Sequence, residues 1–341
     1  MAAELQQLGA IADRHASVRQ SIIVQLIKLL LGLWGDFSDA RDDAARLAIA
    51  ARSASLVGSA TSRMRLQSRS HLQSVFATMS ERPQLPKLVD PYPRNGVSAL
   101  EVYERPGKQF LWELSRGASV DEARDAATER LRQIAEDDVL LADRDESHRV
   151  FEGSKKRVVG YRRVIHPELS TDGTCGLCLV ASQRFYTVGE LLPLHDRCNC
   201  TVMPIVKGDD PGFRLNDDDL KKLYAAAGST SARDLLNTRI TIREHGELGP
   251  VLVKEGDNFR TAKEAGRPEY VKPTPESIRA ANRKARAEAD ARMTTTLAEL
   301  DAIPRDTTDG ALIIHRTNLT RARNYLRDYI RALDNAFAAL Q

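Results

Sequence analysis

The 341-residue chain has few aromatic residues and almost no excess of charge of either sign. Aromatic side chains make up 5% of it, and 50 basic residues stand against 47 acidic ones, for a net charge of +3. A composition poor in aromatics but rich in alanine and charged residues favours helices over an all-β sandwich. The near balance of charge gives no bulk electrostatic field of the kind that marks a dedicated nucleic-acid-binding protein.

The chain also lacks a long uninterrupted hydrophobic run. Its most apolar stretch, residues 22–34, has thirteen residues and is interrupted by Gln25 and Lys28, whereas a membrane span needs about 20. This stretch lies behind a charged segment, too far from Met1 for a signal peptide. We therefore expect no membrane span and synthesis in the cytoplasm, where cysteines more often bind metal or stay reduced than form disulfides.

Several catalytic motifs are absent as well. There is no G-x-x-x-x-G-K-[ST] phosphate loop and no G-x-S-x-G nucleophile elbow. His245 and Glu247 match the H-x-E of zinc deaminases, but a P-C-x-x-C must follow it, and here every cysteine comes earlier. We interpret this segment as a hairpin turn and expect that the chain is not an enzyme.

Hydrophobic periodicity predicts long helices at the N-terminal end. Apolar residues recur every three or four positions, which is typical of one amphipathic helix ended by Gly35. The stripe comprises Leu8, Ile11, His15, Val18, Ile22, Leu26, Leu29 and Leu33. Proline-free, alanine-rich sequence over residues 39–79 predicts a second long helix or two stacked ones. The first helix is either half of an internal hairpin or an element that also presents apolar surface to a partner.

Prolines and capping residues divide the middle of the chain. Four of the fourteen prolines lie between Pro83 and Gly96, which predicts a linker or surface arm. Helical character returns over residues 99–116, expected in two pieces broken at Pro106. Ser119 and Glu122 have the spacing of a capping box, which opens a helix to about residue 142.

Short strands and helices are predicted for the rest. We expect strands at 158–164 and 201–206, a helix over 216–227 with Asn216 as its N-cap, a hairpin of strands 240–243 and 251–254, and helices over 276–302 and 318–340. Among single side chains, His15 is expected in a core or interface, and His71, His148 and His315 at the surface. Trp34 and Trp112 are expected to anchor their helices by packing.

These elements predict a predominantly helical α+β fold, with long N-terminal helices, a small central α/β module holding a Cys/His cluster, and a helical C-terminal extension. We divide the chain into residues 1–82 (long helices), 83–98 (proline-rich linker or arm), 99–157 (helical region), 158–207 (Cys/His module), 208–273 (mixed α/β region with the hairpin) and 274–341 (helical extension).

All four cysteines lie within one stretch of 26 residues. A C-x-x-C pair places two thiolates so that both can face one ion, and a second pair completes a tetrahedron. Five candidates compete for the four positions: Cys175, Cys178, His195, Cys198 and Cys200. Because protein ligands can fill every position, the pattern predicts a structural Zn²⁺ site held by four of these five. Free thiols and disulfides are the open alternatives, and His166 is a candidate supporting partner of a ligand.

A resemblance to a known family begins at this cluster. The residues are Gly160-Tyr-Arg-Arg-Val-Ile-His-Pro-Glu-Leu-Ser170, Gly173-Thr-Cys-Gly-Leu-Cys178, Leu192-Pro-Leu-His-Asp-Arg-Cys-Asn-Cys200 and Pro204. Together they resemble the phage Mu F-like minor capsid family, the head-morphogenesis proteins of tailed bacteriophages. The segment His245-Gly-Glu-Leu-Gly-Pro-Val-Leu252 is similar to a downstream sequence in actinobacteriophage members. The resemblance covers residues 160–252, under a third of the chain, and the flanking regions match only in helical character.

The resemblance implies a low-copy protein of the phage head. Such proteins associate with the portal vertex inside the capsid, and in some phages leave with the DNA. The implied partners are the portal protein and capsid or other internal head proteins, without a membrane in the assembled head. The implied locations are the virion and, during assembly, the host cytoplasm. Two other classes stay open. One is a metal-dependent nuclease or other phage enzyme built around the cluster, for which His195 and Asp196 are candidate residues because they lie beside the cysteines. The other is a cellular zinc-containing adaptor.

The C-terminal segment combines an apolar stripe with arginines. Apolar residues from Leu319 to Leu340 are spaced three or four apart, as in a docking face. Five arginines lie off that stripe: Arg316, Arg321, Arg323, Arg327 and Arg331. They form either the solvated face of a helical hairpin or a surface for packaged double-stranded DNA or an acidic portal surface, through non-specific phosphate contacts in the case of DNA.

Overall fold

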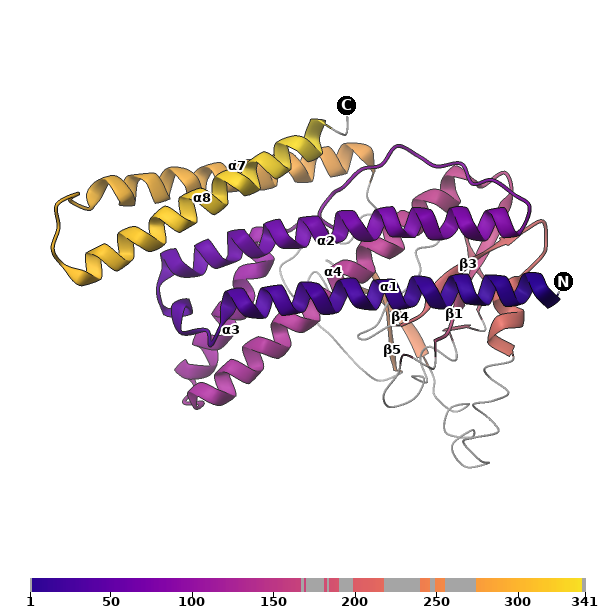
Figure 1. Ribbon diagram of the computed structural model, residues 1–341, viewed down its shortest axis with the longest axis horizontal. Coiled ribbons are helices and arrows are strands. Elements are labelled where there is room, and N and C mark those ends of the chain that lie inside the picture. The colour runs from indigo at the N-terminus through magenta and orange to yellow at the C-terminus, as the bar shows by residue number, and fades with distance from the viewer. Residues whose placement is uncertain are drawn as a thin grey trace. The chain divides into compact units, whose positions relative to one another are not determined.

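The computed structural model describes residues 2–166, 169, 181–182, 184–189, 199–217, 240–245, 249–254 and 274–338. Helices predominate and the strands are short (Figure 1), so the predicted α+β class is confirmed. The chain forms two compact units. The first unit comprises Met1–Ile22, Arg63–Lys87 and Leu140–Val271, and the second comprises Ile23–Ser62, Leu88–Val139 and Lys272–Gln341. Neither unit is a single continuous stretch of chain.

The N-terminal region forms two long helices. Helix α1 spans Ala2–Trp34 and ends at Gly35, whose positive φ of 53° is the left-handed conformation that glycine tolerates at a helix end. A short 3₁₀ turn, η1 (Ser38–Arg41), leads into α2, which spans Asp43–Thr78 as one helix. The Asp42 carboxylate accepts a hydrogen bond from the backbone N–H of Ala45 and so caps the start of α2.

By length and composition, α1 meets the criteria of a membrane span. One of its 18-residue windows has a mean hydropathy of 1.4, and 33% of that window is buried within the protein. Buried core helices of soluble proteins also meet these criteria. The apolar part of α1 is therefore longer than the thirteen-residue run suggested, and Leu26, Leu30 and Trp34 within it are buried against other parts of the chain.

Helix α3 (Ala99–Ser115) does not break at Pro106, so the expectation of two pieces is wrong. The next residue, Gly107, lies against the Trp34 ring: a Cβ there would be 2.8 Å from Trp34 Cζ3. Ser98 caps the helix by accepting a hydrogen bond from the Glu101 N–H. Packing of this kind keeps the helix continuous although proline lacks one backbone donor.

Helix α4 (Val120–Gly153) begins where the capping box predicts but runs well past residue 142. The Ser119 N–H donates to the Glu122 carboxylate at 2.8 Å, and the Glu122 N–H donates to the Ser119 hydroxyl at 3.3 Å. Beyond residue 142 the helix carries buried charged side chains such as Asp143 and Glu146, each paired with a partner. The predicted end of the helix at about residue 142 is therefore wrong. Ion pairs neutralise the buried charges beyond it, so the helix can continue through the core.

Three antiparallel strands form the sheet of the first unit, in the order β2-β1-β3. Strands β1 (Val158–Val164) and β3 (Thr201–Val206) have the predicted bounds and pair from Val164 with Thr201 to Val158 with Val206. Strand β2 is Tyr186–Thr187. The sheet packs on aromatic and aliphatic side chains of α2 and α4, among them Phe76 and Phe151. Strands β4 (Ile240–His245) and β5 (Gly249–Lys254) form the predicted antiparallel pair.

The second unit is built on a helical pair, α7 (Pro275–Ala302) and α8 (Gly310–Ala338), which pack against each other (Figure 1). Thr274 and Ser277 form a capping box at the start of α7. Helix α8 starts earlier than residue 318, and its predicted stripe is buried from Leu319 to Tyr329. The core of this unit places Leu326 and Tyr329 on the alanine-rich face of α2.

The proline-rich segment is a fixed arm and not a loose linker. No helix or strand is present between Thr78 and Ala99, all of which is described. In the second unit the Tyr92 hydroxyl donates to the buried Asp138 carboxylate at 2.9 Å, and Arg94 Nε donates to it at 2.6 Å. The Tyr103 hydroxyl of α3 donates to the same carboxylate at 2.9 Å. These charge-assisted bonds hold the end of the arm on α4.

Candidate functional site

The predicted cysteine site falls in the segment between β1 and β3, two strands that pair with each other. Of its five candidate ligands, Cys200 lies in the described part of the chain, and Cys175, Cys178, His195 and Cys198 lie outside it. Because Val164 pairs with Thr201, the segment between β1 and β3 leaves and re-enters the sheet at the same end. Within the described ranges, no group of three or more His, Cys, Asp or Glu side chains is placed to hold a metal ion.

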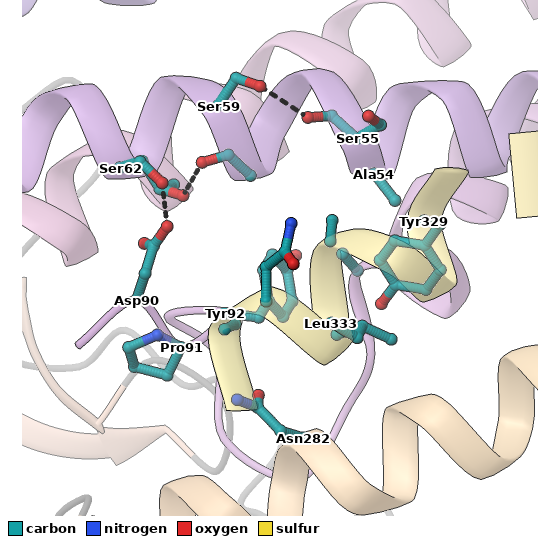
Figure 2. A pocket seen from close by; sticks show the side chains of 16 residues that line it. Ala54, Ser55, Ser59, Ser62, Asp90, Pro91, Tyr92, Asn282, Tyr329 and Leu333 are labelled. Atoms are coloured by element: carbon teal, nitrogen blue, oxygen red, sulfur yellow. Dashed lines mark hydrogen bonds between the residues drawn. The ribbon is translucent and has the colours of Figure 1, made fainter. Parts of the chain in front are cut away.

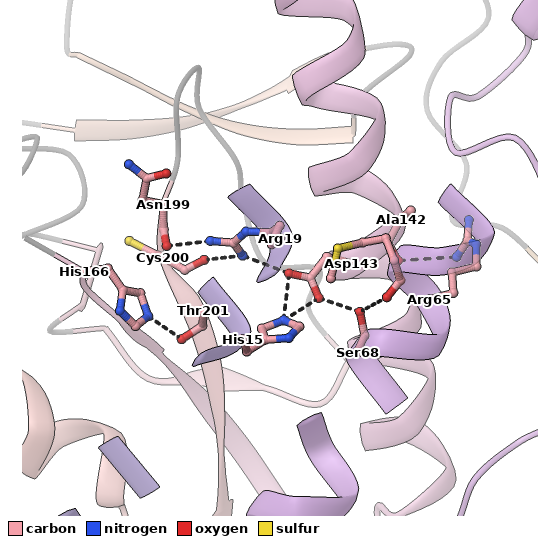
Figure 3. Close-up of polar contacts among 11 residues, drawn as sticks. His15, Arg19, Arg65, Ser68, Ala142, Asp143, His166, Asn199, Cys200 and Thr201 are labelled. Carbon is pink, nitrogen blue, oxygen red and sulfur yellow. Dashed lines mark hydrogen bonds and ion pairs between the residues drawn. The ribbon is translucent and has the colours of Figure 1, made fainter. Parts of the chain in front are cut away.

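Arg19 of α1 holds the cysteine end of this segment (Figure 3). Its guanidinium donates to the carbonyl oxygens of Asn199 at 2.5 Å and Cys200 at 2.9 Å, and to the Asp143 carboxylate at 2.8 Å. The planar guanidinium carries five N–H donors in a fixed fork, which suits several acceptors at once. These bonds use the backbone of Cys200, and its sulfur points away from Arg19 (Figure 3).

Asp143 of α4 is the centre of a buried polar group, which we call the Asp143 cluster: His15, Arg19, Ser68, His71 and Asp143. The carboxylate accepts hydrogen bonds from Ser68 Oγ at 2.7 Å and His15 Nε2 at 3.1 Å as well as from Arg19. Burial by itself would raise the pKa of Asp143, but His15, Arg19 and Ser68 together hold that pKa well below its ordinary value of 3.8. Asp143 is therefore an ionised carboxylate inside the first unit.

His71 of α2 stacks on His15, with ring centroids 4.1 Å apart and planes 13° from parallel. Burial, followed by the charge of His15, lowers the pKa of His71 well below 6.5. The expectation of a surface position is wrong for both His71 and His148, which are buried. For His71 the sequence did carry a signal: Ser68, His71, Leu72, Val75 and Phe76 have the spacing of one helix face, and all five are buried.

The Asp143 cluster holds a serine, a histidine and an aspartate but not the geometry of a nucleophilic triad. In such a triad the serine hydroxyl bonds to the histidine that acts as base. Here Ser68 and His15 both bond to the Asp143 carboxylate, and all three residues are buried. The geometry is that of a structural cluster, which ties α1, α2 and α4 to the start of β3.

His166 supports the same corner from the other strand. It lies two positions after the last residue of β1, and its Nε2 lies 2.9 Å from the hydroxyl of Thr201, the residue after Cys200. Its Nδ1 lies 3.3 Å from the Asp13 carboxylate of α1. His166 therefore contacts the residue that follows Cys200, and its role as the supporting partner of a metal ligand stays a prediction.

Asn216 is not a helix N-cap, contrary to the prediction. It lies in a helical turn over residues 211–217, and the rest of the predicted helix lies outside the described residues. Its side-chain oxygen accepts from the Ile165 N–H at 3.0 Å, and its Nδ2 donates to the Arg163 carbonyl at 2.7 Å. Asn216 thus closes the end of β1, from which the cysteine segment departs.

Trp34 and Trp112, both expected to anchor their helices by packing, differ in the structure. Trp112 is exposed and lies beneath the Arg116 guanidinium, so it does not anchor its helix, whereas Trp34 does.

On α7 and α8, Arg286 pairs with Asp334, and Arg331 pairs with Asp328. Residues 274–338 hold eleven basic and nine acidic residues. The solvated face and the DNA-binding surface both stay predictions for the arginines of α8.

No family model, curated protein or solved structure matches this chain.

Proposed function

We propose that this chain is a structural minor capsid protein of a tailed bacteriophage, acting in head morphogenesis inside the head near the portal vertex. The resemblance of residues 160–252 to the Mu F-like family is the observation that carries the proposal. The chain acts in this proposal by binding, without catalysis.

The proposal gives the cysteine segment a structural role. Four of Cys175, Cys178, His195, Cys198 and Cys200 would hold one Zn²⁺, which would supply folding free energy to this segment. Arg19 bonds to the backbone of Asn199 and Cys200 and to Asp143. The geometry of the loop would therefore be coupled to the long helices that carry the Asp143 cluster.

Helix α1 supplies a candidate contact surface for the portal protein. Along its predicted stripe, Leu8, His15, Ile22 and Leu26 are buried within the chain, but Leu29 is 54% exposed, as is Val24 nearby. Single exposed aliphatic residues are normal on protein surfaces, so the proposal rests on Leu29 being an exposed member of the otherwise largely covered stripe of α1. We therefore propose that this part of α1, in the second unit, contacts the portal or another head protein.

Mass spectrometry of purified virions tests the proposed function. The expected result is that peptides of this chain are present at a low ratio to those of the portal protein, which serves as the internal standard for copy number. Virions that contain portal peptides but none from this chain would contradict the proposal, provided the chain is expressed in the infected cell. Expression is checked in the same lysate by the same peptides.

Two biochemical results would favour the other classes. Metal-dependent cleavage of DNA by the purified protein, abolished by Cys175→Ser, would favour a nuclease built around the cluster. Capture of a bacterial protein in place of portal protein would favour a cellular zinc-containing adaptor. Neither result is expected.

A further inference from the structure

Basic side chains gather in the first unit where α4 joins β1, and we call this group the basic corner: Arg82, Lys155, Lys156, Arg157 and Lys207. Three of them belong to the turn between the end of α4 and the start of β1, and Lys207 directly follows β3. Because Val158 pairs with Val206, Arg157 and Lys207 flank the same pair of residues. Arg157 Nη1 donates to the carbonyl oxygen of Arg82 at 2.6 Å, which places the start of the arm beside them.

The basic corner has an excess of positive charge in a chain whose total charge is nearly balanced. Residues 81–84, 152–159 and 205–208 hold five basic residues and two acidic ones, Glu81 and Glu152. Glu81 pairs with both Arg157, at 3.9 Å, and Lys207. The other three basic side chains are exposed and have no ion-pair partner among the described residues. The corner therefore attracts anionic groups.

Lys207 occupies a turn position that the backbone disfavours for lysine. The Asp209 N–H donates to the Val206 carbonyl oxygen at 2.9 Å, which closes a two-residue hairpin turn. Lys207 and Gly208 both have positive φ, 53° and 84°, as in a type I′ turn, for which Asn-Gly is the preferred sequence. The Lys207 side chain is 74% exposed, so burial does not compensate for this conformation. Residues held in disfavoured conformations cluster at functional sites.

The residue types in the corner favour phosphate groups over an acidic protein as the partner. Protein–protein interfaces are depleted of lysine and enriched in aromatic residues, whereas three of the five corner residues are lysines and none is aromatic. Exposed lysines and arginines supply the sequence-independent contacts of proteins to DNA. Duplex DNA carries one negative charge per about 1.7 Å of its axis, so several cations of one corner can each meet a phosphate.

The described cavity of the second unit is not an alternative site for an anion. This cavity of about 380 Å³ lies between α2 and α8 (Figure 2). Among the described residues that line it, Asp90 is the one charged side chain, and none is a lysine or arginine. An anionic ligand would be repelled there without meeting a counter-charge.

We propose that the basic corner binds the phosphate backbone of double-stranded DNA without reading its base sequence. The turn that carries the lysines is closed by backbone hydrogen bonds to the Ser154 carbonyl oxygen, from the N–H of Arg157 at 2.8 Å and of Val158 at 3.0 Å. A backbone fixed in this way loses little freedom on binding. DNA binding of this kind goes beyond the proposed function and does not depend on it, because it is measured on the purified chain.

Fluorescence anisotropy with a short labelled DNA duplex and the full chain tests the proposal. We expect two duplexes of unrelated sequence to bind equally, and the logarithm of the affinity to fall against the logarithm of salt concentration with a slope of about −3 to −5. Lys155→Gln combined with Lys156→Gln should weaken binding roughly tenfold at low salt and bring the slope about 2 closer to zero. Arg14→Gln combined with Lys28→Gln is the matched control, because it removes the same charge from exposed positions of α1.

Lys207 provides a second variant that separates binding from folding. Lys207→Asn introduces a residue that the turn favours, so its melting temperature should not lie below that of the wild type, although its affinity for DNA should fall several-fold. Lys207→Arg keeps the charge and should bind DNA as the wild type does. A residue with a structural role alone would not combine an undiminished melting temperature with a loss of DNA affinity.

Four outcomes would overturn the proposal. They are no salt-dependent binding to the wild-type chain, undiminished binding to the folded Lys155→Gln, Lys156→Gln variant, tighter binding of a single strand than of the duplex, and equal competition by poly-L-glutamate, which would assign the corner to an acidic protein. If Arg327→Gln combined with Arg331→Gln abolishes binding while the lysine variant binds normally, the DNA contact belongs to α8. Absence of the chain from virions would contradict the proposed function and leave this result standing.

Discussion

Arg19 shows how one side chain can connect a loop to a helical core. It is 4% exposed and bonds to Asp143 and to the carbonyl oxygens of Asn199 and Cys200. Arg19→Ala would leave the Asp143 carboxylate buried with one fewer cationic partner. Removing one partner of a buried ion pair costs about 3–5 kcal/mol, so we expect the free energy of unfolding to fall by that amount in urea titrations.

A measurement of zinc affinity can show whether Arg19 couples the helical core to the predicted zinc site or only stabilises the fold. If Arg19 positions the Cys200 backbone for metal binding, Arg19→Ala also lowers the affinity of the chain for zinc. A competition titration should show a decrease of roughly tenfold or more. Arg14→Ala is the control, since Arg14 lies exposed on the same helix. A variant that loses stability but binds zinc as the wild type does would contradict the coupling.

His71 gives the first unit a defined pH dependence. Its pKa in the folded protein lies below 6.5, its value in the unfolded chain. As pH falls through 6.5 the unfolded chain takes up a proton that the folded chain does not, so the free energy of unfolding falls with pH, by at most about 1.4 kcal/mol per unit. Asp143, with its lowered pKa, contributes stability that is lost only at pH values below 3.8.

Urea unfolding across this pH range checks the assignment. His71→Phe keeps the stacked ring but removes the titrating group, so its free energy of unfolding should depend less on pH between about 7 and about 5 than that of the wild type. Leu66→Ala, at an exposed position of α2 without a titrating group, should keep the wild-type slope. An unchanged slope in His71→Phe would show that other groups set the acid sensitivity.

At the scale of elements, two glycines test how tightly helices approach each other. Gly107 of α3 leaves no room for a Cβ beside the Trp34 ring, whereas Gly32 of α1 has open space around it. We expect Gly107→Ala to destabilise the protein by about 1–3 kcal/mol through overpacking. Gly32→Ala should instead stabilise it by about 0.5–1 kcal/mol, because alanine favours a helix. Equal melting temperatures for the two variants would contradict the observed packing.

The cysteine segment is a second element-scale test. We expect about one zinc per chain by metal analysis after purification without chelator. Cys175→Ser should lower that content and expose the segment between β1 and β3 to proteolysis, since structural zinc contributes directly to folding. EDTA treatment of the wild type is the control and should produce the same cleavage pattern. A protein without zinc and with unchanged proteolysis in the variant would support free thiols.

Elements with a regular local pattern could be predicted from the sequence, and those set by distant contacts could not. Strands β1 and β3 and the capping box at Ser119 carry their signals within a few residues. The end of α4 depends on buried ion pairs, such as Glu146 with Arg69, that join distant positions. Continuity of α3 through Pro106 depends in the same way on packing beside the proline, at Gly107 against Trp34.

The candidate site also has parts with a local sequence pattern and parts that depend on contacts between distant positions. The spacing of its cysteines and histidine is a local pattern, and the zinc site that this pattern predicts stays a prediction, because four of the five candidate ligands lie outside the described residues. The Asp143 cluster has no motif, because His15 and Asp143 are 128 positions apart and belong to different helices. Two signals in the sequence pointed to parts of it: the apolar stripe that contains His15, and the spacing of the buried residues around His71 on α2.

At the scale of the whole molecule, variants of α1 can distinguish the folding of the chain from its proposed assembly with portal protein. Leu29 is 54% exposed and Leu26, one turn earlier, is 2% exposed. Leu29→Asp should leave the melting temperature within a few degrees of the wild type while reducing co-assembly with portal protein in co-expression. Leu26→Asp should unfold the second unit, because it places a charge in the core. Normal co-assembly of Leu29→Asp would remove this face from the proposed interface.

The separation of His15 from Asp143 also has a consequence for synthesis on the ribosome. The first unit draws on residues up to Ile22 and again from Leu140 onward, and 128 positions separate the two partners. At typical translation rates of about 5–20 residues per second, the nascent α1 waits for roughly 10 seconds before its buried partners emerge. During that interval its apolar and charged face is uncovered, so this chain is expected to depend on a holding chaperone and to fold only after most of it has been translated.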